Sequence, residues 1–202
     1  ILFNADVASL YTNMDLKKCI KFVGQKLDNS RFKKEKKFIL ELLSIILFNY
    51  DFNYNQQYYK QTNGVSMGCS LAGELANLYL SFLDHEITKK WKNLIYYRRY
   101  MDDIFGIFRG TEDEFTTFKT ATNNIFPELN LSFESSFKKI NFLDTLIYKF
   151  NEIIPSIDSN DNITYNKVTK LAYRLYVKPG NTVSIISKDS FISSSTKEAV
   201  IY

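Results

Sequence analysis

Residues 97–108 read YRRYMDDIFGIF, two apolar, β-prone runs on either side of an aspartate pair, Asp102 and Asp103. Aromatic and β-branched residues favour strands, so the pattern predicts a tight hairpin with the carboxylates at its turn. Strand periodicity predicts that Tyr100 and Asp102 lie on one face. Clustered carboxylates on a buried hairpin need a nearby cation, and Mg²⁺ accepts carboxylate and phosphate oxygens. The structural alternative is that the aspartates merely end two strands, since Asp is common in turns.

Size and composition are those of an ordinary globular chain. With 202 residues it can form one large domain or two small ones. The 45% hydrophobic and 24% charged residues allow a substantial core. A net charge of +4 weakly favours a polyanionic partner. The single histidine, His85, disfavours a histidine-based zinc site and a Ser-His-Asp triad.

The cysteines and the first residues of the chain bear on where the protein is located and on whether it is part of a longer chain. Cys19 and Cys69 form no Cys-x-x-Cys motif, so we expect reduced thiols in an intracellular protein, with the nucleus as one candidate compartment. No apolar run is long enough to span a membrane and no signal peptide is visible, so no membrane partner is expected. The chain begins at Ile1 without an initiator Met, which suggests a piece of a longer polyprotein.

The first half of the chain predicts a strand, two helices and a hairpin. Residues 1–7 have the pattern of a short strand that ends near Asp6. A capping box at Thr12 and Asp15 predicts a helix start. The expected buried stripe of this helix is Leu16, Ile20, Val23 and Leu27. A second helix, about 35–49, is apolar nearly all round, which predicts a position deep in the core. A hairpin is expected at 52–62, and then a loop with two glycines at 63–70.

The second half alternates helices and strands. A long helix is expected over about 71–92, with an apolar face made of Leu71, Leu75, Leu78 and Phe82. Thr111 and Glu114 form a capping box, whose acidic first turn suits the helix dipole. Strands are expected at 129–133, 140–150 and 171–177, with a polar loop at 158–162. The predicted fold class is α+β, an antiparallel sheet with helices packed on one face.

Asp6 and the pair Asp102–Asp103 each end or interrupt a predicted strand. If these strands are neighbours in one sheet, the three carboxylates meet and raise one another's pKa. Two Mg²⁺ (or Mn²⁺) ions about 3.5–4 Å apart would relieve that repulsion and clamp both oxygens of an in-line displacement. We therefore expect phosphoryl transfer, in which a 3′-hydroxyl attacks a nucleoside triphosphate and catalysis comes from positioning and charge neutralisation.

Several segments resemble reverse transcriptases, in the order of that family's motifs. Residues 6–13, DVASLYTN, resemble motif A, more narrowly the Asp-Val-x-Ser-Leu-Tyr-Thr-Asn form of Penelope-like retroelements. Residues 61–71, QTNGVSMGCSL, with ANLY at 76–79, resemble motif B, and YMDD at 100–103 resembles motif C. Residues 141–144, NFLD, look like the primer-grip region, and YVKP at 176–179 is similar to a Tyr-Arg-Lys-Pro segment further on.

The resemblance implies a polymerase palm and assigns roles by position. Asp6 and Asp102 would be the chief catalytic metal ligands, with Asp103 supporting them. Tyr11 occupies the steric-gate position, where a ring under the sugar C2′ rejects a 2′-hydroxyl. The structural alternative is a core tyrosine at a strand end. With Tyr11, the residues implied to touch the nucleotide are Val7, Met67 and Gly68.

Further positions are implied to contact the template or primer, namely Gln61, Tyr100, Phe142 and Leu143. For Gln61 the alternative is a contact with the motif B loop itself. Phe142 and Leu143 would hold the primer end, or could simply be core residues. Lys138 or Lys139 is a candidate for the cation beside the leaving pyrophosphate, and solvated hairpin lysines are an equal alternative.

Some features depart from the family pattern. The usual motif B has prolines where Ser66, Ser70 and Gly73 stand, so we expect a loop of different shape. The sequence begins at motif A, so we expect the fingers to be missing. We likewise expect a missing or truncated thumb and no GIY-YIG-type endonuclease.

The resemblance thus predicts the palm of an RNA-directed DNA polymerase over residues 1–150 and a truncated palm–thumb connection over 151–202. Its implied partners are an RNA template, a DNA primer, deoxynucleoside triphosphates and the missing segments of a longer polyprotein. One alternative is a truncated or domesticated domain that grips nucleic acid without polymerase activity. Another is a two-metal nuclease on an unrelated fold, which would explain the carboxylates but neither Tyr11 nor the 61–71 loop.

Overall fold

The computed structural model describes residues 1–157 and 163–176. Its elements in chain order are β1 (Leu2–Ala8), α1 (Leu10–Asn13), α2 (Leu16–Asp28), α3 (Lys36–Phe48), β2 (Asp51–Tyr54), β3 (Gln57–Lys60), α4 (Ala72–Lys90), β4 (Leu94–Tyr100), β5 (Asp103–Phe108), α5 (Glu112–Asn123), β6 (Asn130–Ser136), β7 (Lys139–Phe142), β8 (Thr145–Ile157) and β9 (Ile163–Leu175). The predicted loop 158–162 and most of the YVKP segment lie outside the described residues.

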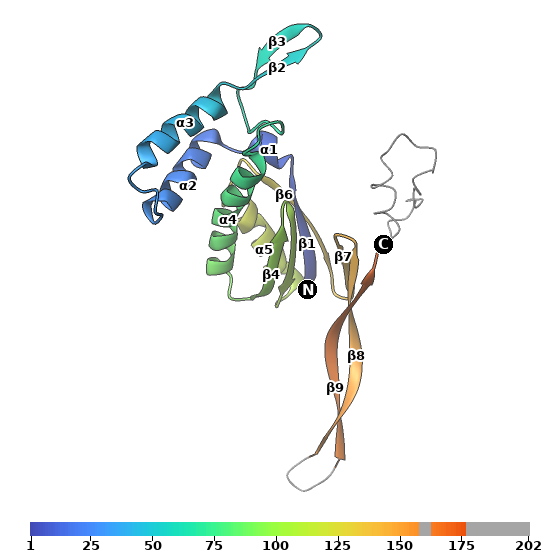
Figure 1. Cartoon of the computed structure of the whole chain (residues 1–202). Coiled ribbons are helices and arrows are strands. Elements are labelled where there is room, and N and C mark those ends of the chain that lie inside the picture. The colour runs from blue at the N-terminus through green and yellow to red at the C-terminus, as the bar shows by residue number, and fades with distance from the viewer. Residues whose placement is uncertain (158–162, 177–202) are drawn as a thin grey trace, which may run out of the picture.

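A four-stranded sheet with the order β4-β5-β1-β6 forms the centre of the molecule, and all of its neighbouring strands are antiparallel. Its main core lies on one face, where Phe3, Val7 and Phe108 pack with residues of α2, α4 and α5. Figure 1 shows α4 and α5 on one side of this sheet. The predicted fold class, an α+β antiparallel sheet with helices on one face, is confirmed.

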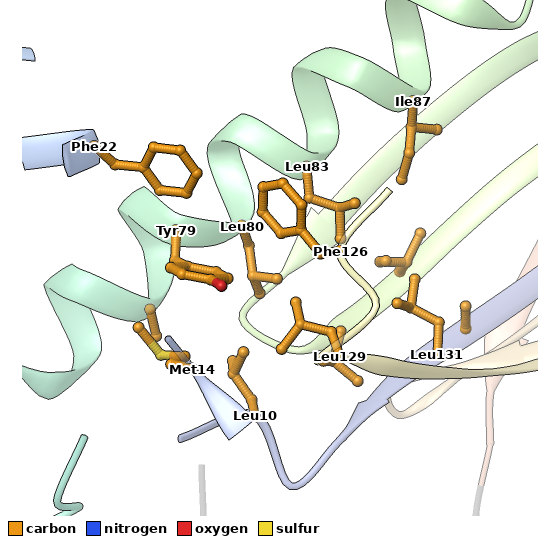
Figure 2. Close-up of a cluster of buried hydrophobic side chains, with 14 of the residues drawn as sticks. Leu10, Met14, Phe22, Tyr79, Leu80, Leu83, Ile87, Phe126, Leu129 and Leu131 are labelled. Carbon is orange, nitrogen blue, oxygen red and sulfur yellow. The ribbon is translucent and has the colours of Figure 1, made fainter. Parts of the chain in front are cut away.

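The long helix α4 supplies much of that core. Figure 2 shows Tyr79, Leu80, Leu83 and Ile87 of α4 beside Leu129 and Leu131. The buried face of α4 therefore differs from the predicted stripe, since Leu71 is exposed and Leu78 and Phe82 are only partly buried. Leucines are frequent on several sides of this helix, so periodicity alone does not decide which side packs.

A second sheet, β7-β8-β9, covers part of the opposite face of the central sheet. There Leu2 and Phe105 pack against Ile140 of β7. The predicted single strand 140–150 is wrong, because a turn at Leu143, with φ of 52°, separates β7 from β8. The hairpin β8–β9 projects well beyond the body of the molecule (Figure 1). The proposed division at residue 150 falls within β8 and stays a prediction.

The prediction that the second helix lies deep in the core is wrong. Helix α3 buries Leu43 and Leu47, but Phe38 is 63% exposed and Ile45 is 60% exposed. Helix α3 packs mainly against one neighbour, α2, so its second apolar face has no cover among the described residues. Apolar residues on all sides show that a helix can be buried. How much of it is buried depends on how many other helices and strands pack against it.

Two helix starts were predicted from capping boxes, and one of them is confirmed. At α5 the Thr111 side chain accepts from the Glu114 amide while the Glu114 carboxylate accepts from the Thr111 amide. At α2 the cap is instead Asp15, which accepts from the Lys18 amide at 2.9 Å. The extended backbone of Met14, with ψ of 128°, separates α1 from α2. None of the helices in the described part of the chain is both long and apolar enough to cross a membrane.

Candidate catalytic site

Strand pairing brings Asp6 and Asp103 together. In the β1–β5 register they are direct partners, and opposite residues of an antiparallel pair point to the same face. Asp6 also pairs with Ser132 of β6, and Asp103 pairs with Tyr100 of β4. The four residues form one row across the sheet, on the face opposite the helix-covered core.

Asp102 lies in the hairpin turn rather than in either strand. Because Tyr100 pairs with Asp103, the two intervening residues, Met101 and Asp102, form the turn. The prediction that Tyr100 shares a face with Asp102 is therefore wrong. Asp103, the partner of Tyr100 across the hairpin, is the aspartate that lies on the same face. Met101 has φ of 54°, in the left-handed region that a non-glycine residue seldom adopts.

The carboxylates of Asp6 and Asp102 interact electrostatically. Burial raises the pKa of Asp6 above its ordinary value, the negative charge of Asp102 raises it further, and a hydrogen bond with the Val7 backbone opposes the rise. A bound cation would relieve this repulsion. The three aspartates therefore meet at one end of β1, as the strand pattern predicts.

The chemistry of these side chains fits a hard divalent cation. Mg²⁺ prefers carboxylate oxygens and keeps several waters or phosphate oxygens in its shell, so a few protein carboxylates suffice. Among the described residues, no three His, Cys, Asp or Glu side chains are arranged closely enough to hold an ion as they stand.

An open recess of about 580 Å³ lies over Asp6 and Asp103. The β7–β8 turn, with Phe142 and Leu143, forms a second wall of this recess. The Asn4 side chain links the two walls by donating to the backbone oxygen of Asn141 at 2.9 Å. The lining residues are Asn4, Ala5, Asp6, Asp103, Ser132, Glu134, Asn141, Phe142, Leu143, Asp144 and Tyr176, which include four acids and no lysine or arginine.

The predicted nucleotide side of the site lies around α1. Tyr11 is half-buried against the main core, and its carbonyl oxygen accepts from the Val65 amide at 2.7 Å. The side chain of Val7 is buried in the core beneath the sheet, so only its backbone is available to a nucleotide.

Gly64, which sequence reasoning did not single out, holds the glycine loop to α1. It has φ of 71°, and a Cβ there would lie 2.5 Å from the backbone oxygens of Tyr11 and Thr12. Only glycine fits such a close approach with positive φ. The Asn63-Gly64 dipeptide, a strong turn signal, was the clue in the sequence.

The other loop residues have different surroundings. A Cβ on Gly68 would lie 2.5 Å from the Tyr50 hydroxyl, so the close approach there involves protein. Met67 is 75% exposed and free to meet a ligand. The side-chain amide of Gln61 donates to the Asn63 carbonyl at 2.9 Å, which gives it a role within the loop itself.

Lys138 and Lys139 lie away from the aspartates. Both are exposed and follow Ser136, which pairs with Leu2 at the other end of β1 from Asp6. Asp6 lies four residues further along β1 than Leu2, a distance of about 13 Å along the strand. This placement favours the alternative that they are solvated hairpin lysines.

Comparison with known proteins identifies the class. A family model described as "Reverse transcriptase (RNA-dependent DNA polymerase)" matches residues 2–166. The chain therefore belongs to the reverse transcriptase family. None of the curated proteins compared with the chain matches it.

Among solved structures, the chain is similar in fold to yeast telomerases. Apo telomerase from Candida tropicalis, truncated from its C-terminal domain, superposes with a TM-score of 0.57 at 16% identity, covering 82% of this chain and 35% of the other. Telomerase from Candida albicans in complex with a fragment of telomeric RNA gives a TM-score of 0.58 at 14% identity, covering 82% and 30%. The chain thus spans about a third of the length of these telomerases.

Proposed function

We propose that this chain is the palm of an RNA-directed DNA polymerase, which transfers nucleotides onto a primer 3′-hydroxyl by two-metal chemistry. The observation that carries the proposal is the meeting of Asp6, Asp102 and Asp103 at one end of the central sheet. Membership of the reverse transcriptase family supports the same reaction class.

Each part of the site has a role in this reaction. Asp6 and Asp102 are the chief ligands of two Mg²⁺ or Mn²⁺ ions, and Asp103 supports them. When bound, such ions neutralise the triphosphate and the attacking and leaving oxygens. Asp6 and Asp103 line the recess together with Phe142 and Leu143, so a primer end held by Phe142 and Leu143 would lie beside these two carboxylates. Orienting the reactants supplies much of the rate in phosphoryl transfer.

Tyr11 and the loop around Met67 and Gly68 form the nucleotide side. The Val65–Tyr11 hydrogen bond joins the motif B loop to the motif A turn, so the two segments act as one unit. In this role Tyr11 excludes ribonucleotides by its bulk.

The finer identity is also part of the proposal. The DVASLYTN segment and the NFLD segment support a Penelope-like subtype within the family. The partners are then an RNA template, a DNA primer, deoxynucleoside triphosphates and fingers and thumb segments of a longer polyprotein. We place the protein inside the cell, with the nucleus as a candidate compartment, because both described cysteines are free thiols.

The competing function is a truncated or domesticated domain that binds nucleic acid without polymerising. The aspartate cluster favours catalysis, since nucleic acid binding alone gains nothing from negative charge. The nuclease on an unrelated fold no longer applies, because the chain has the fold and family of reverse transcriptases.

The test is primer extension with an RNA template, a DNA primer, deoxynucleotides and Mg²⁺ or Mn²⁺. We expect extension by the parent chain, supplied with fingers and thumb segments if it is inactive alone. Asp102→Asn should abolish extension because the amide keeps the shape and loses the charge. Asp113→Asn is the matched control, because this acid lies in the first turn of α5. Extension that survives in Asp102→Asn would remove this residue from catalysis.

A further inference from the structure

Arg99 lies at the centre of a hydrogen-bond network behind the aspartate turn. Its side chain is only 11% exposed and forms an ion pair with Asp84 of α4, at 2.8 Å between Nη2 and Oδ2. Its Nε donates to both carboxylate oxygens of Asp84, at 3.1 and 2.9 Å. The Tyr97 hydroxyl donates to the same carboxylate at 2.7 Å. The Asp84 carboxylate thus fixes the direction of the guanidinium.

The remaining donors of Arg99 reach the turn and the motif B helix. Nη1 donates to the carbonyl oxygen of Met101 at 2.8 Å, and also to the side-chain oxygen of Asn77 at 3.3 Å. Nη2 approaches the Asn77 carbonyl at 3.4 Å. One planar group therefore joins helix α4 to the turn residue directly before Asp102.

The turn needs such a support. Met101 has φ of 54°, a conformation that costs energy in a residue with a side chain and persists only where the surroundings impose it. Met101 is one of two residues between paired strand ends, so its peptide orientation sets the direction of Asp102. A hydrogen bond to its carbonyl oxygen fixes that peptide.

We propose that Arg99, oriented by Asp84, is a positioning residue that holds the Met101–Asp102 turn in the form that presents the aspartates to metal. The proposal deepens the proposed function and rests on it for the metal. Arg99 acts through the turn backbone and does not itself touch metal or substrate. Its link to Asn77 also couples the motif B helix to the site.

A positioning role and a simple charge effect predict opposite results. The Arg99 guanidinium, which hydrogen-bonds the turn, repels a divalent ion bound there. If charge alone mattered, removing Arg99 should therefore tighten metal binding. If Arg99 positions the turn, its removal should weaken metal binding. Arg99→Gln removes the charge and the fork of donors together, so the sign of the change decides between the two.

The chain offers a closely matched control. Glu128 has the same 24% side-chain exposure as Asp84. It also accepts from one cation, Lys18, and one tyrosine hydroxyl, Tyr79. That network joins α2 and α4 without touching the 101–103 turn. Glu128→Gln, like Arg99→Gln, removes a partly buried ion pair. It therefore controls for any general loosening of the fold that such a loss causes.

The first measurement is amide hydrogen exchange of the whole chain without metal, followed in residues 97–105. Arg99→Gln is expected to speed exchange at residues 101–103 at least tenfold, and Glu128→Gln to leave it as in the parent. Unchanged exchange in Arg99→Gln, or equal acceleration in both variants, would overturn the inference. Because no ion is present, this result does not depend on the proposed function.

The second measurement is Mn²⁺ affinity, from the free-ion electron paramagnetic resonance signal. Arg99→Gln should bind Mn²⁺ at least tenfold more weakly, as is usual when a group orienting metal ligands is lost. Glu128→Gln should match the parent. Tighter binding by Arg99→Gln would overturn the positioning role. If Asp102→Asn binds Mn²⁺ as well as the parent, the metal site of the proposed function fails instead, and the exchange result still decides the role of Arg99 at the turn.

Discussion

At the residue scale, Gly64 shows how one missing side chain shapes the site. Its positive φ and its approach to the Tyr11–Thr12 backbone leave no room for a Cβ. Gly64→Ala should destabilise the fold by about 2 kcal/mol or more, since strained backbone adds to the clash. Thermal or urea unfolding measures the change.

The matched comparison is Gly73→Ala. Gly73 is the second residue of α4, and a Cβ added there would meet nothing within 4 Å. Because alanine favours helix over glycine, this variant should gain about 0.5–1 kcal/mol. Equal effects at the two glycines would show that the close approach at Gly64 is unimportant.

Tyr11 provides the second prediction at this scale. If its ring is the steric gate, Tyr11→Ala should admit ribonucleotides while metal binding persists, because the bulk that excludes a 2′-hydroxyl is gone. Competition of dATP with ATP during primer extension measures the change. Because the Tyr11 ring is half-buried, Tyr11→Ala should also lower the free energy of unfolding by about 1–3 kcal/mol. A stable, active variant that still refuses ATP would show that Tyr11 is a packing residue only.

At the element scale, Glu128 fastens α2 to α4. It accepts from Lys18 at 2.7 Å and from the hydroxyl of Tyr79, a side chain with no exposed surface. Burial alone would raise the pKa of Glu128, but hydrogen bonds from Lys18 and Tyr79 outweigh burial and hold it below its ordinary value of 4.5. The folded state therefore favours the ionised form.

This pKa shift predicts how stability depends on pH. A carboxyl whose pKa is lowered by folding stabilises the fold fully above the unfolded value of 4.5 and loses that contribution as pH falls through the folded value. Glu128→Gln should cost about 1.5–3 kcal/mol near pH 7, the usual contribution of a hydrogen bond to a charged group. The difference from the parent should shrink in unfolding curves taken from pH 5 to pH 3. A constant difference across that range would contradict the prediction.

At the scale of the whole molecule, chain topology assembles the site from distant segments. The central position of β1, between β5 and β6, puts Asp6 beside both Asp103 and Ser132. The β7–β8 turn then adds Phe142 and Leu143 from the other sheet. A ligand bound in this recess would contact the central sheet and the β7–β8 turn at once.

Metal should therefore raise the stability of the whole chain. A ligand that binds only the folded state adds about 2.7 kcal/mol at a concentration 100 times its Kd. We expect Mn²⁺ to raise the Tm of the parent and of Asp113→Asn, but not that of Asp102→Asn. A rise of equal size in all three proteins would mean that the ion binds elsewhere.

Local signals in the sequence determined the strands of the central sheet, including the hairpin of residues 97–108, and the capping box of α5. Each depends on alternation or on side chains three residues apart, so neighbours along the chain suffice to specify it. The same local patterns placed Asp6 and the Asp102–Asp103 pair at strand ends. The family followed from those motifs in order.

Tertiary structure alone decided the features that depend on distant neighbours. It left one face of α3 exposed, set Gly64 against Tyr11, and placed Lys138 at the far end of β1 from Asp6. It also joined Arg99 to Asp84 and Asn77, residues whose spacing along the chain gives no sign of contact. Periodicity tells which side of an element can be buried, whereas packing between separate elements determines what covers it and which polar groups meet.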